Sequence, residues 1–561
     1  MTTLGTADTF KRQWLDGFVT AYGRTVRKVP DAYGVVRREG GTRPGKVAVV
    51  IGGGCGHYPA FAGLVGPGLA DGAVVGDVFT SPSAEQVYRT ARAADTGAGV
   101  LFGFGNYQGD VLHFGLAARR LAAEGIKSRT ILVTDDIASG PAAEPERRRG
   151  VAGDFLVFKI AGAAAERGYD LDAVHVVAEK ANARTRTFGV AFGGCTLPGA
   201  AEPLFTVADR EMEVGLGIHG EPGVRTVGRL SAAELADELV DGLLPELPEG
   251  SRVVALLNGL GRTKYEEMFV TYTRVHERLA EAGLSPVHTE VGEFVTSLDM
   301  AGVSLSILVL DDELAELYSA PCDTPGYRTT GAELAQVPLE STVDDLLAET
   351  EPGTGVVDRV LTAALRSIEE NEAELGRLDA VAADGDHGLG MTRGMRAAVV
   401  AARRSGETVS GSLLAAGTAF ADAAGGASGA LYGVLLAETG AGLKGLAADE
   451  ITTGALADAV DGAVRAFTEL GKAEPGDKTM LDAIEPFRAV LREQAGVDVA
   501  QAWRKAARAA VTAAEETAHL LPAKGRAARL AQRSKGHPDP GAVSFSLLVT
   551  AVGEELGRNV D

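Results

Sequence analysis

Cysteine is scarce in this chain, with three in 561 residues, Cys55, Cys195 and Cys322. They are far apart and odd in number, so we expect reduced thiols and no disulfide framework. No apolar run approaches the length needed to cross a bilayer, and no basic segment followed by an apolar one marks the N-terminus as a signal peptide. We therefore expect a cytoplasmic protein with no membrane partner.

Positive charge is also in deficit. Lys and Arg number 54 against 76 Asp and Glu, which gives a net charge of −22 at pH 7. That excess repels phosphate backbones and anionic lipids, and so argues against nucleic acid or a membrane surface as the main partner. Small phosphate ligands are still compatible with it, because bound cations invert the local field.

The rest of the composition is that of an ordinary globular protein, with 45% hydrophobic and 23% charged residues. A chain of this length should form more than one domain. Over residues 1–330, short β-branched runs at 47–51, 99–102 and 131–134 alternate with helical patterns. This rhythm predicts a parallel α/β region, which we divide into two α/β subdomains near residues 190–200.

A change of composition follows this region. Residues 331–355 are rich in acidic side chains and end near Pro352-Gly353, which predicts a linker. From 356 to 561 the sequence is Ala-rich with helical spacing and almost no strand-like runs, which predicts an all-helical domain.

The most informative acidic motif is the run 378–388, which holds Asp379, Asp384 and Asp386 around Gly385. Their mutual repulsion costs stability unless a divalent cation offsets it, and a sharp turn at the glycine would aim the carboxylates inward. Open coordination positions would suit Mg²⁺ that also binds nucleotide phosphates. The alternative is a helix cap followed by a solvated loop.

Polar residues gather where the predicted strands end, and His57 and Asp110 form a plausible acid/base pair there. His219 stands among small residues in Gly-Ile-His-Gly-Glu-Pro-Gly, where an imidazole nitrogen could attack a carbonyl. Each of these three has a plainer interpretation as a turn or N-cap residue. The run 425–430 would admit phosphates to backbone N–H groups, or else allow close helix packing. Arg526 could contact a phosphate, and the rigid turn 536–542 could border the nucleotide site. A solvated loop would look similar.

Together the motifs resemble those of the dihydroxyacetone kinase family in its single-chain, ATP-dependent form. They span nearly the whole chain and are Gly52-Gly53-Gly54-Cys55-Gly56-His57, Gly76-Asp77-Val78-Phe79-Thr80-Ser81-Pro82, Asn106-Tyr107-Gln108-Gly109-Asp110, Arg149-Gly150-Val151-Ala152-Gly153, Gly217-Ile218-His219-Gly220-Glu221, Thr296-Ser297-Leu298-Asp299-Met300-Ala301-Gly302, Asp384-Gly385-Asp386-His387-Gly388, Gly425-Gly426-Ala427-Ser428-Gly429 and Asp539-Pro540-Gly541-Ala542.

The resemblance implies a ketose-binding α/β region followed by a helical-barrel nucleotide domain. It implies that His219 holds the ketose as a hemiaminal while His57 and Asp110 assist proton transfer. The implied substrate-binding residues are Gly53, Gly54, Cys55, Gly56, His57, Asn106, Asp110 and His219. Asp379, Asp384 and Asp386 would hold two Mg²⁺ ions on ATP. The implied nucleotide contacts are His387, Gly388, Ser428, Gly429, Thr479, Met480, Arg526, Asp539, Pro540 and Gly541. Members of this type are usually homodimers whose active site is shared between chains.

Dihydroxyacetone-specific relatives typically carry serine and glutamate where this chain has Cys55 and Tyr58. They also tend to have a lysine where this chain has Gly105. The missing side chain predicts a larger pocket, and we expect erythrulose as the substrate, with dihydroxyacetone as the alternative. The sequence does not decide between the D and L forms. Other readings are a non-catalytic sugar sensor, a phosphotransferase subunit and an FAD-cyclising side activity.

Overall fold

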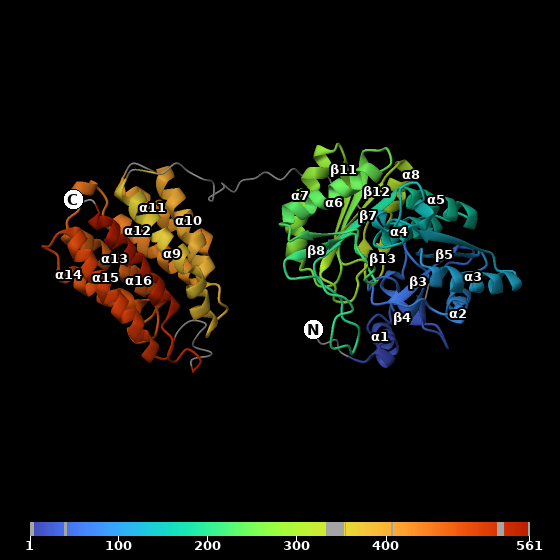
Figure 1. Cartoon of the computed structure of the whole chain (residues 1–561), viewed down its shortest axis with the longest axis horizontal. Helices are drawn as coiled ribbons and strands as arrows, with labels where there is room; N and C mark the ends of the chain where they lie inside the picture. The colour runs from blue at the N-terminus through green and yellow to red at the C-terminus, as the bar shows by residue number, and fades with distance from the viewer. Residues whose placement is uncertain are drawn as a thin grey trace. The chain divides into compact units, whose positions relative to one another are not determined.

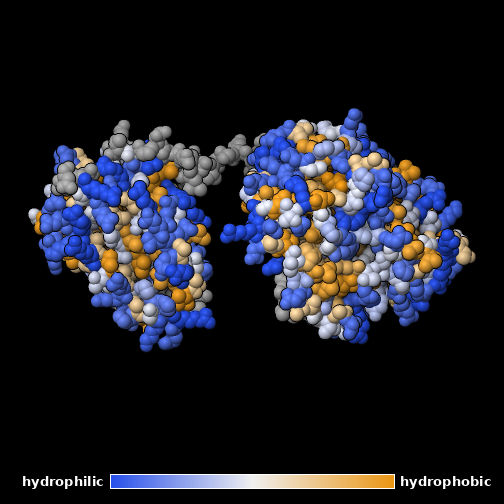
Figure 2. Space-filling model, in the orientation of Figure 1, coloured by the Kyte–Doolittle hydropathy of each residue, from blue (hydrophilic) through white to orange (hydrophobic). Residues whose placement is uncertain are grey.

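The computed structural model describes residues 5–38, 42–331, 353, 355–405, 408–523 and 532–558. The chain divides into two compact units, Met1–Gln336 and Val337–Asp561 (Figure 1). Nearly all of the predicted linker, 331–355, lies outside the described residues. The viewed face of each unit is mainly hydrophilic, with scattered hydrophobic patches (Figure 2).

The first sheet has the strand order β1-β2-β4-β3-β5-β6. Its strands are Val26–Lys28 (β1), Gly34–Arg37 (β2), Ala48–Cys55 (β3), Gly72–Val78 (β4), Val100–Gly105 (β5) and Ser128–Val133 (β6). β3, β4, β5 and β6 are parallel, whereas β1 and β2 are antiparallel at the edge. β3 continues beyond the β-branched run 47–51, because Gly52, Gly53 and Cys55 still pair with β4.

Helices cover both faces of this sheet, which explains why its central strands are continuous apolar runs. One face packs against α1 (Ala7–Ala21), α4 (Gly153–Glu166) and α5 (Leu171–Ala183), and the other against α2 (Ala84–Ala94) and α3 (Gln108–Ala123). Successive residues of β3 alternate between the two cores, with Val49 and Ile51 on one side and Ala48 and Val50 on the other.

The second sheet has the order β11-β10-β12-β7-β8-β9 and is antiparallel except for the β10–β11 pair. Its strands are Thr185–Ala191 (β7), Glu211–Val214 (β8), Arg225–Gly228 (β9), Arg252–Gly259 (β10), Ser285–Gly292 (β11) and Gly302–Val309 (β12). Because β7 already belongs to this sheet, the change of subdomain falls before Thr185, earlier than the expected 190–200.

One helix joins the two sheets. α4 contacts β3 and β5 of the first sheet and β7 and β12 of the second, and every residue from Gly153 to Ala165 is buried. The second sheet's other face is covered by α6 (Ala232–Leu243) and α7 (Tyr265–Glu281). α8 (Asp312–Tyr318) and a two-stranded ribbon of Cys322–Asp323 (β13) and Arg328–Thr329 (β14) complete the described part of this unit.

The second unit is helical throughout its described residues. Its helices are Val356–Ala380 (α9), His387–Ser405 (α10), Val409–Ala424 (α11), Gly426–Gly442 (α12), Thr453–Gly471 (α13), Leu481–Glu493 (α14), Val499–Glu516 (α15) and Pro540–Gly557 (α16). Each helix packs against the next in sequence, and α16 packs against α9. The predicted order of an α/β region followed by a helical region is confirmed. No helix in the described part of the chain is both long and apolar enough to span a membrane.

Candidate active site

The first cluster of predicted site residues lies where β3, β4 and β5 end. The loops that follow these parallel strands supply His57, Phe79 and Tyr107, and the loop after β8 supplies His219. The ring centroids of His57, Phe79 and Tyr107 lie 5.0, 5.2 and 4.7 Å from that of His219, each edge-on to it. The His219 side chain is 22% exposed, so a ring held on three sides still faces solvent.

His57 is buried and its hydrogen bonds fix its tautomer. Its Nδ1 lies 2.7 Å from the carbonyl oxygen of Thr296, which can only accept, so Nδ1 carries the proton. Its Nε2 lies 3.2 Å from Nε2 of His219. Burial, and then the charge of His219, lower the pKa of His57 to about 3, so its ring is neutral at physiological pH.

Asp110 lies in the first turn of α3 with its side chain buried. Its Oδ1 has no hydrogen-bond partner in the described part of the chain. Burial raises the pKa of this carboxyl to about 6, although the hydroxyl of Ser81 and the charge of His219 act in the opposite direction. A carboxyl that titrates near neutrality and keeps a free acceptor is suited to general acid/base chemistry.

The other predicted substrate residues have mainly structural contacts. Gly53 packs against the ring of Phe61, and Gly54 and Gly56 pack against Phe79. The Cys55 thiol is buried in the core, and burial raises its pKa to about 11. Asn106 donates through Nδ2 to the carbonyl oxygens of Glu146 and Arg148, both at 2.9 Å. These contacts shape the strand ends.

We expected open space beside Gly105, but other atoms occupy the space next to its Cα. A Cβ on Gly105 would lie 3.1 Å from both the carbonyl oxygen of Gly150 and the ring of Tyr107. The Tyr107 hydroxyl donates to that same carbonyl at 3.1 Å, which holds the ring in place. Tyr107 therefore fills the space where we had expected the pocket to widen.

The three predicted metal ligands do come together. Each of Asp379, Asp384 and Asp386 offers a carboxylate oxygen within 4.8 Å of the others. Asp379 lies near the end of α9 and accepts from the backbone N–H of Gly385 at 2.8 Å. Gly385 has φ of +79°, a conformation that favours glycine and turns Asp384 and Asp386 toward Asp379. Clustered hard oxygen donors with two exposed members fit Mg²⁺ that keeps positions open for phosphate.

His387 follows this cluster directly and links it to other predicted nucleotide residues. His387, the first residue of α10, lies 2.9 Å from the hydroxyl of Ser544 on α16 and 3.4 Å from that of Ser428 on α12. Gly388 is buried beside His387, and Gly429 is buried beside Ser428. A Cβ on Gly541 would lie 3.3 Å from that of Met480, which precedes α14. The N-termini of α10, α12, α14 and α16 thus meet at one end of the unit.

Four converging helix N-termini favour an anion, because their free N–H groups and dipoles all present positive charge. Asp539 caps α16, accepting from the N–H of Ala542 at 2.8 Å, and Pro540 begins the helix. Burial raises the pKa of Asp539 to about 7. Thr479 donates its N–H to Asp482 at 2.7 Å. Arg526 lies outside the described residues.

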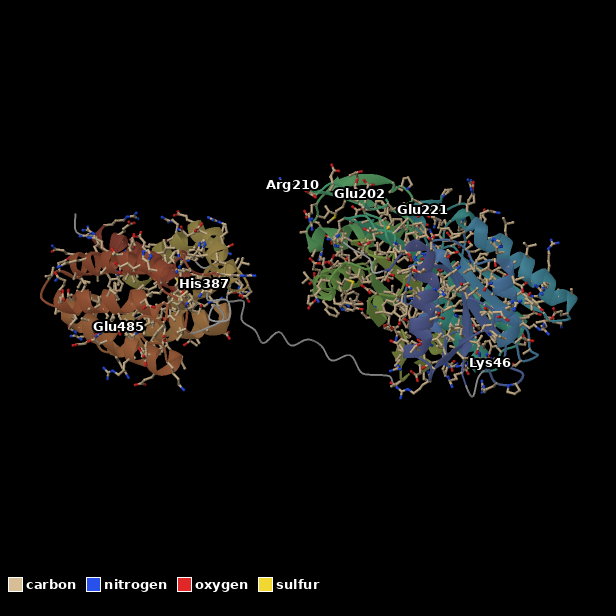
Figure 3. The ribbon with its side chains drawn as sticks, turned by 90° about the horizontal axis from the view of Figure 1, so that it is seen from below. Lys46, Glu202, Arg210, Glu221, His387 and Glu485 are labelled. Atoms are coloured by element: carbon tan, nitrogen blue, oxygen red, sulfur yellow. The ribbon has the colours of Figure 1, made fainter. Side chains whose placement is uncertain are left out.

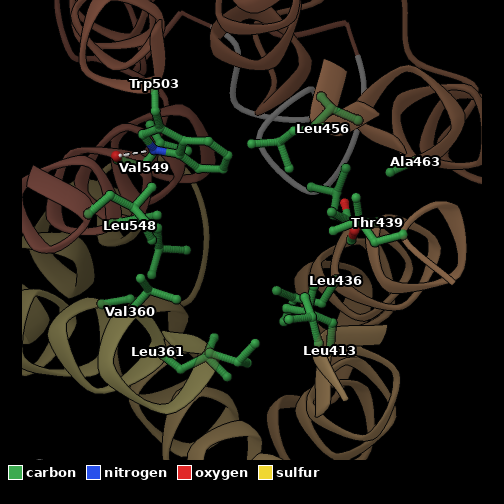
Figure 4. Close-up of a pocket in the computed structure, with 18 of the residues that line it drawn as sticks. Val360, Leu361, Leu413, Leu436, Thr439, Leu456, Ala463, Trp503, Leu548 and Val549 are labelled. Atoms are coloured by element: carbon green, nitrogen blue, oxygen red, sulfur yellow. Dashed lines mark hydrogen bonds between the residues drawn. The ribbon is translucent and has the colours of Figure 1, made fainter. Parts of the chain in front are cut away.

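A separate cavity of about 370 Å³ lies among the helices of the second unit (Figure 4). It is lined mainly by apolar side chains, among them Leu361, Leu436 and Leu548, and by Trp503, whose indole donates to the carbonyl oxygen of Val549. Neither the three aspartates nor His387 is among its described lining residues. Its apolar walls do not suit phosphates, so the polar end of the unit is the nucleotide candidate.

Sequence reasoning missed Glu221, Arg149 and the aromatic neighbours of His219. Glu221 accepts from Nδ1 of His219 at 3.1 Å and lies 3.6 Å from Nη1 of Arg149. A carboxylate two residues after a candidate nucleophilic histidine was the available signal for Glu221. The ring contacts of Phe79 and Tyr107 had no such signal, because they depend on how three strand ends converge.

Comparisons with known proteins identify the family of the chain. The chain matches the Dak1 domain over residues 16–326 and the DAK2 domain over residues 381–554. It is 51% identical to the L-erythrulose 1-kinase of Mycolicibacterium smegmatis over 99% of both chains. It is 50% identical to the D-erythrulose kinase of the same organism over 97% of both. A crystal structure of the dihydroxyacetone kinase from C. freundii in complex with AMP-PNP and Mg²⁺ aligns over 99% of both chains, with 29% identity and a TM-score of 0.60. The resemblance found in the sequence is confirmed, and the chain belongs to the dihydroxyacetone kinase family.

Proposed function

We propose that this chain is an ATP-dependent kinase that phosphorylates a terminal hydroxyl of erythrulose, and that it acts in the cytoplasm. The observation that carries the proposal is its 51% identity, along the whole of both chains, to an L-erythrulose 1-kinase. Dihydroxyacetone is the alternative substrate, since the structural relative named for it is 29% identical. Identities of 51% and 50% to L- and D-erythrulose kinases are too close to choose an enantiomer.

In this proposal His219 adds to the ketone carbonyl through Nε2 and holds the substrate as a hemiaminal. Its partly exposed ring inside a cage of three aromatic or imidazole rings supports this role. His57 is neutral and positioned to pass a proton at the carbonyl. Asp110, with its free buried oxygen, accepts the proton of the reacting hydroxyl. A covalent bond would fix the orientation of the ketose and exclude polyols that have no carbonyl.

The helical unit supplies the nucleotide site of the proposal. Asp379, Asp384 and Asp386 would hold two Mg²⁺ ions, which neutralise the charge of the ATP phosphates. The helix N-termini around His387 and Ser428 would receive the phosphates through backbone N–H groups. The closed order of contacts from α9 to α16 supports a helical barrel. We further propose a homodimer in which the ketose unit of one chain serves the nucleotide unit of the other.

The test compares kcat/KM for Mg²⁺- and ATP-dependent phosphorylation of L-erythrulose, D-erythrulose, dihydroxyacetone and glyceraldehyde. We expect one erythrulose enantiomer to be preferred. We also expect activity to vanish in His219→Ala and to persist in the matched control His276→Ala, which alters an exposed histidine on α7. A preference for dihydroxyacetone would contradict erythrulose as the substrate but would still support the kinase activity. Binding without turnover of any of these sugars would favour a sensor.

A further inference from the structure

Glu221 contacts His219 on the side away from His57. Its Oε1 lies 3.1 Å from Nδ1 of the His219 ring, and its Oε2 accepts from the backbone N–H of His219 at 3.0 Å. One carboxylate therefore holds both the backbone and the ring of the residue proposed to capture the ketose.

The protonation state of His219 follows from its two ring contacts. A carboxylate can only accept, so Nδ1 of His219 donates to Glu221. His57 keeps its proton on Nδ1, bound to Thr296, so its Nε2 can only accept. Nε2 of His219, 3.2 Å away, must then donate to it. With both nitrogens donating, the His219 ring is an imidazolium.

Glu221 is itself held in place as an anion. Nη1 of Arg149 lies 3.6 Å from its Oε2, and Arg149 donates through Nε and Nη2 to Asp136 at 3.0 and 2.8 Å. Burial opposes ionisation of Glu221, but the hydrogen bonds and charge of His219, with Arg149, outweigh it and lower its pKa to about 2. Gly217 makes room for this arrangement, because a Cβ there would overlap both Glu221 and Arg149.

We propose that Glu221 is a positioning residue that supplies the counter-charge for covalent capture of the ketose, with Arg149 and Asp136 fixing its orientation. Glu221 lies on the side of the unit opposite Lys46 in Figure 3, well apart from the buried ion pair of Lys46 and Asp71. The inference deepens the proposed function and rests on it.

The capture step balances without any outside proton. The Nε2 proton of His219 passes to Nε2 of His57, and the freed Nε2 lone pair forms a bond to the carbonyl carbon. The carbonyl π pair moves onto oxygen, which takes the proton from His57. The His219 ring ends as it began, cationic, with its Nδ1 proton on Glu221. The ring is neutral only between the loss of its Nε2 proton and the formation of the new bond, so the counter-charge stabilises the cation before and after addition.

The experiment replaces the carboxylate by an amide in the full-length protein. Glu221→Gln keeps the size of the side chain but loses the charge, and it places an N–H donor against either His219 or Arg149. We expect the KM for the ketose to rise about 30-fold or more, as when a charge-assisted hydrogen bond is lost, while the KM for MgATP changes less than about twofold. The matched control is Glu211→Gln on an exposed position of β8, with both constants unchanged.

Carbon-13 NMR of ketose labelled at the carbonyl gives a direct readout. We expect the wild type to convert the ketone signal to that of a tetrahedral carbon, and Glu221→Gln to lose most of this adduct. Arg149→Lys keeps the positive charge but holds Glu221 less firmly, so this variant should lose part of the adduct. It replaces Glu221→Gln in the test if that variant does not fold. If either folded variant forms as much adduct as the wild type, the role of Glu221 is contradicted but covalent capture is not. A wild type without adduct overturns covalent capture, and with it this inference.

Discussion

Asp154 is a buried carboxyl near the candidate ketose site, and its Oδ1 has no hydrogen-bond partner among the residues that the structure describes. Burial, with the nearby Asp135 and Asp110 charges, raises its pKa well above the usual value. A carboxyl with a raised pKa stays protonated in the folded state while the unfolded chain ionises above about pH 4. Unfolding is therefore favoured progressively as pH rises, until the folded pKa is reached.

Asp154→Asn removes that titration at nearly constant volume. We expect the variant to gain stability over the wild type as pH rises, by up to about 3 kcal/mol between about pH 5 and about pH 7. Urea unfolding of both proteins at the two pH values measures the difference. A stability gap that is independent of pH would show that Asp154 is already ionised in the folded protein.

Burial of the three cysteines gives a second prediction at this scale. Cys55, Cys195 and Cys322 are free and buried, and desolvation raises the pKa of each thiol. Thiolate is the reactive form, so we expect slow alkylation of the folded protein and three reactive thiols after denaturation. Mass spectrometry after a short treatment with iodoacetamide counts them. Rapid modification of Cys55 in the folded state would show that it faces the substrate pocket after all.

The sequence was most informative where function is local. Asp379, Asp384 and Asp386 lie within eight residues of one another, and one turn at Gly385 brings their oxygens together. The His57–His219 contact joins residues 162 positions apart, on loops from different sheets, and no spacing rule reaches that far. The filled space beside Gly105 depends on Tyr107 and Gly150, which a comparison of single positions does not reveal.

At the scale of elements, periodicity located the strands but not their ends. β3 continues through Gly52 and Gly53 because β4 supplies hydrogen-bond partners there, and such pairing is a tertiary property. β7 likewise joins the second sheet at Thr185 through its pairing with β12, which lies more than a hundred residues later. The helical unit was easier to predict, because an amphipathic helix carries its pattern within itself.

The turn between α9 and α10 depends on one backbone conformation. Gly385 has φ of +79°, and a Cβ there would lie 3.2 Å from that of Ala380. Gly385→Ala should strain the turn by about 1–2 kcal/mol and displace Asp384 and Asp386. We expect a KM for MgATP raised about tenfold or more, with little change in the KM for the ketose, measured by steady-state kinetics.

The matched control for that turn is Gly462→Ala within α13. A Cβ at Gly462 meets nothing within 4 Å, and alanine is the better helix former by about 1 kcal/mol. We expect unchanged kinetics and equal or higher stability. Equal KM values for MgATP in the two variants would show that the Gly385 turn does not position the metal ligands.

At the scale of the whole molecule, the two units have separate hydrophobic cores. The clusters of the first unit involve buried residues from Leu15 to Cys322, and that of the second from Val357 to Val549. Each core is large enough for independent folding, so the units should unfold as two transitions. A ligand that binds one folded unit stabilises that unit by mass action and leaves the other unchanged.

We therefore expect residues 1–336 and 337–561 to fold when expressed separately. The ketose should raise the Tm of the first fragment only, and MgATP that of the second only. Each of the two candidate sites is built from residues of a single unit. Differential scanning calorimetry of both fragments and of the intact chain tests this. If the second fragment binds no MgATP, part of the nucleotide site must be supplied by the first unit. Turnover also needs both substrates brought together, so neither fragment alone should phosphorylate the ketose.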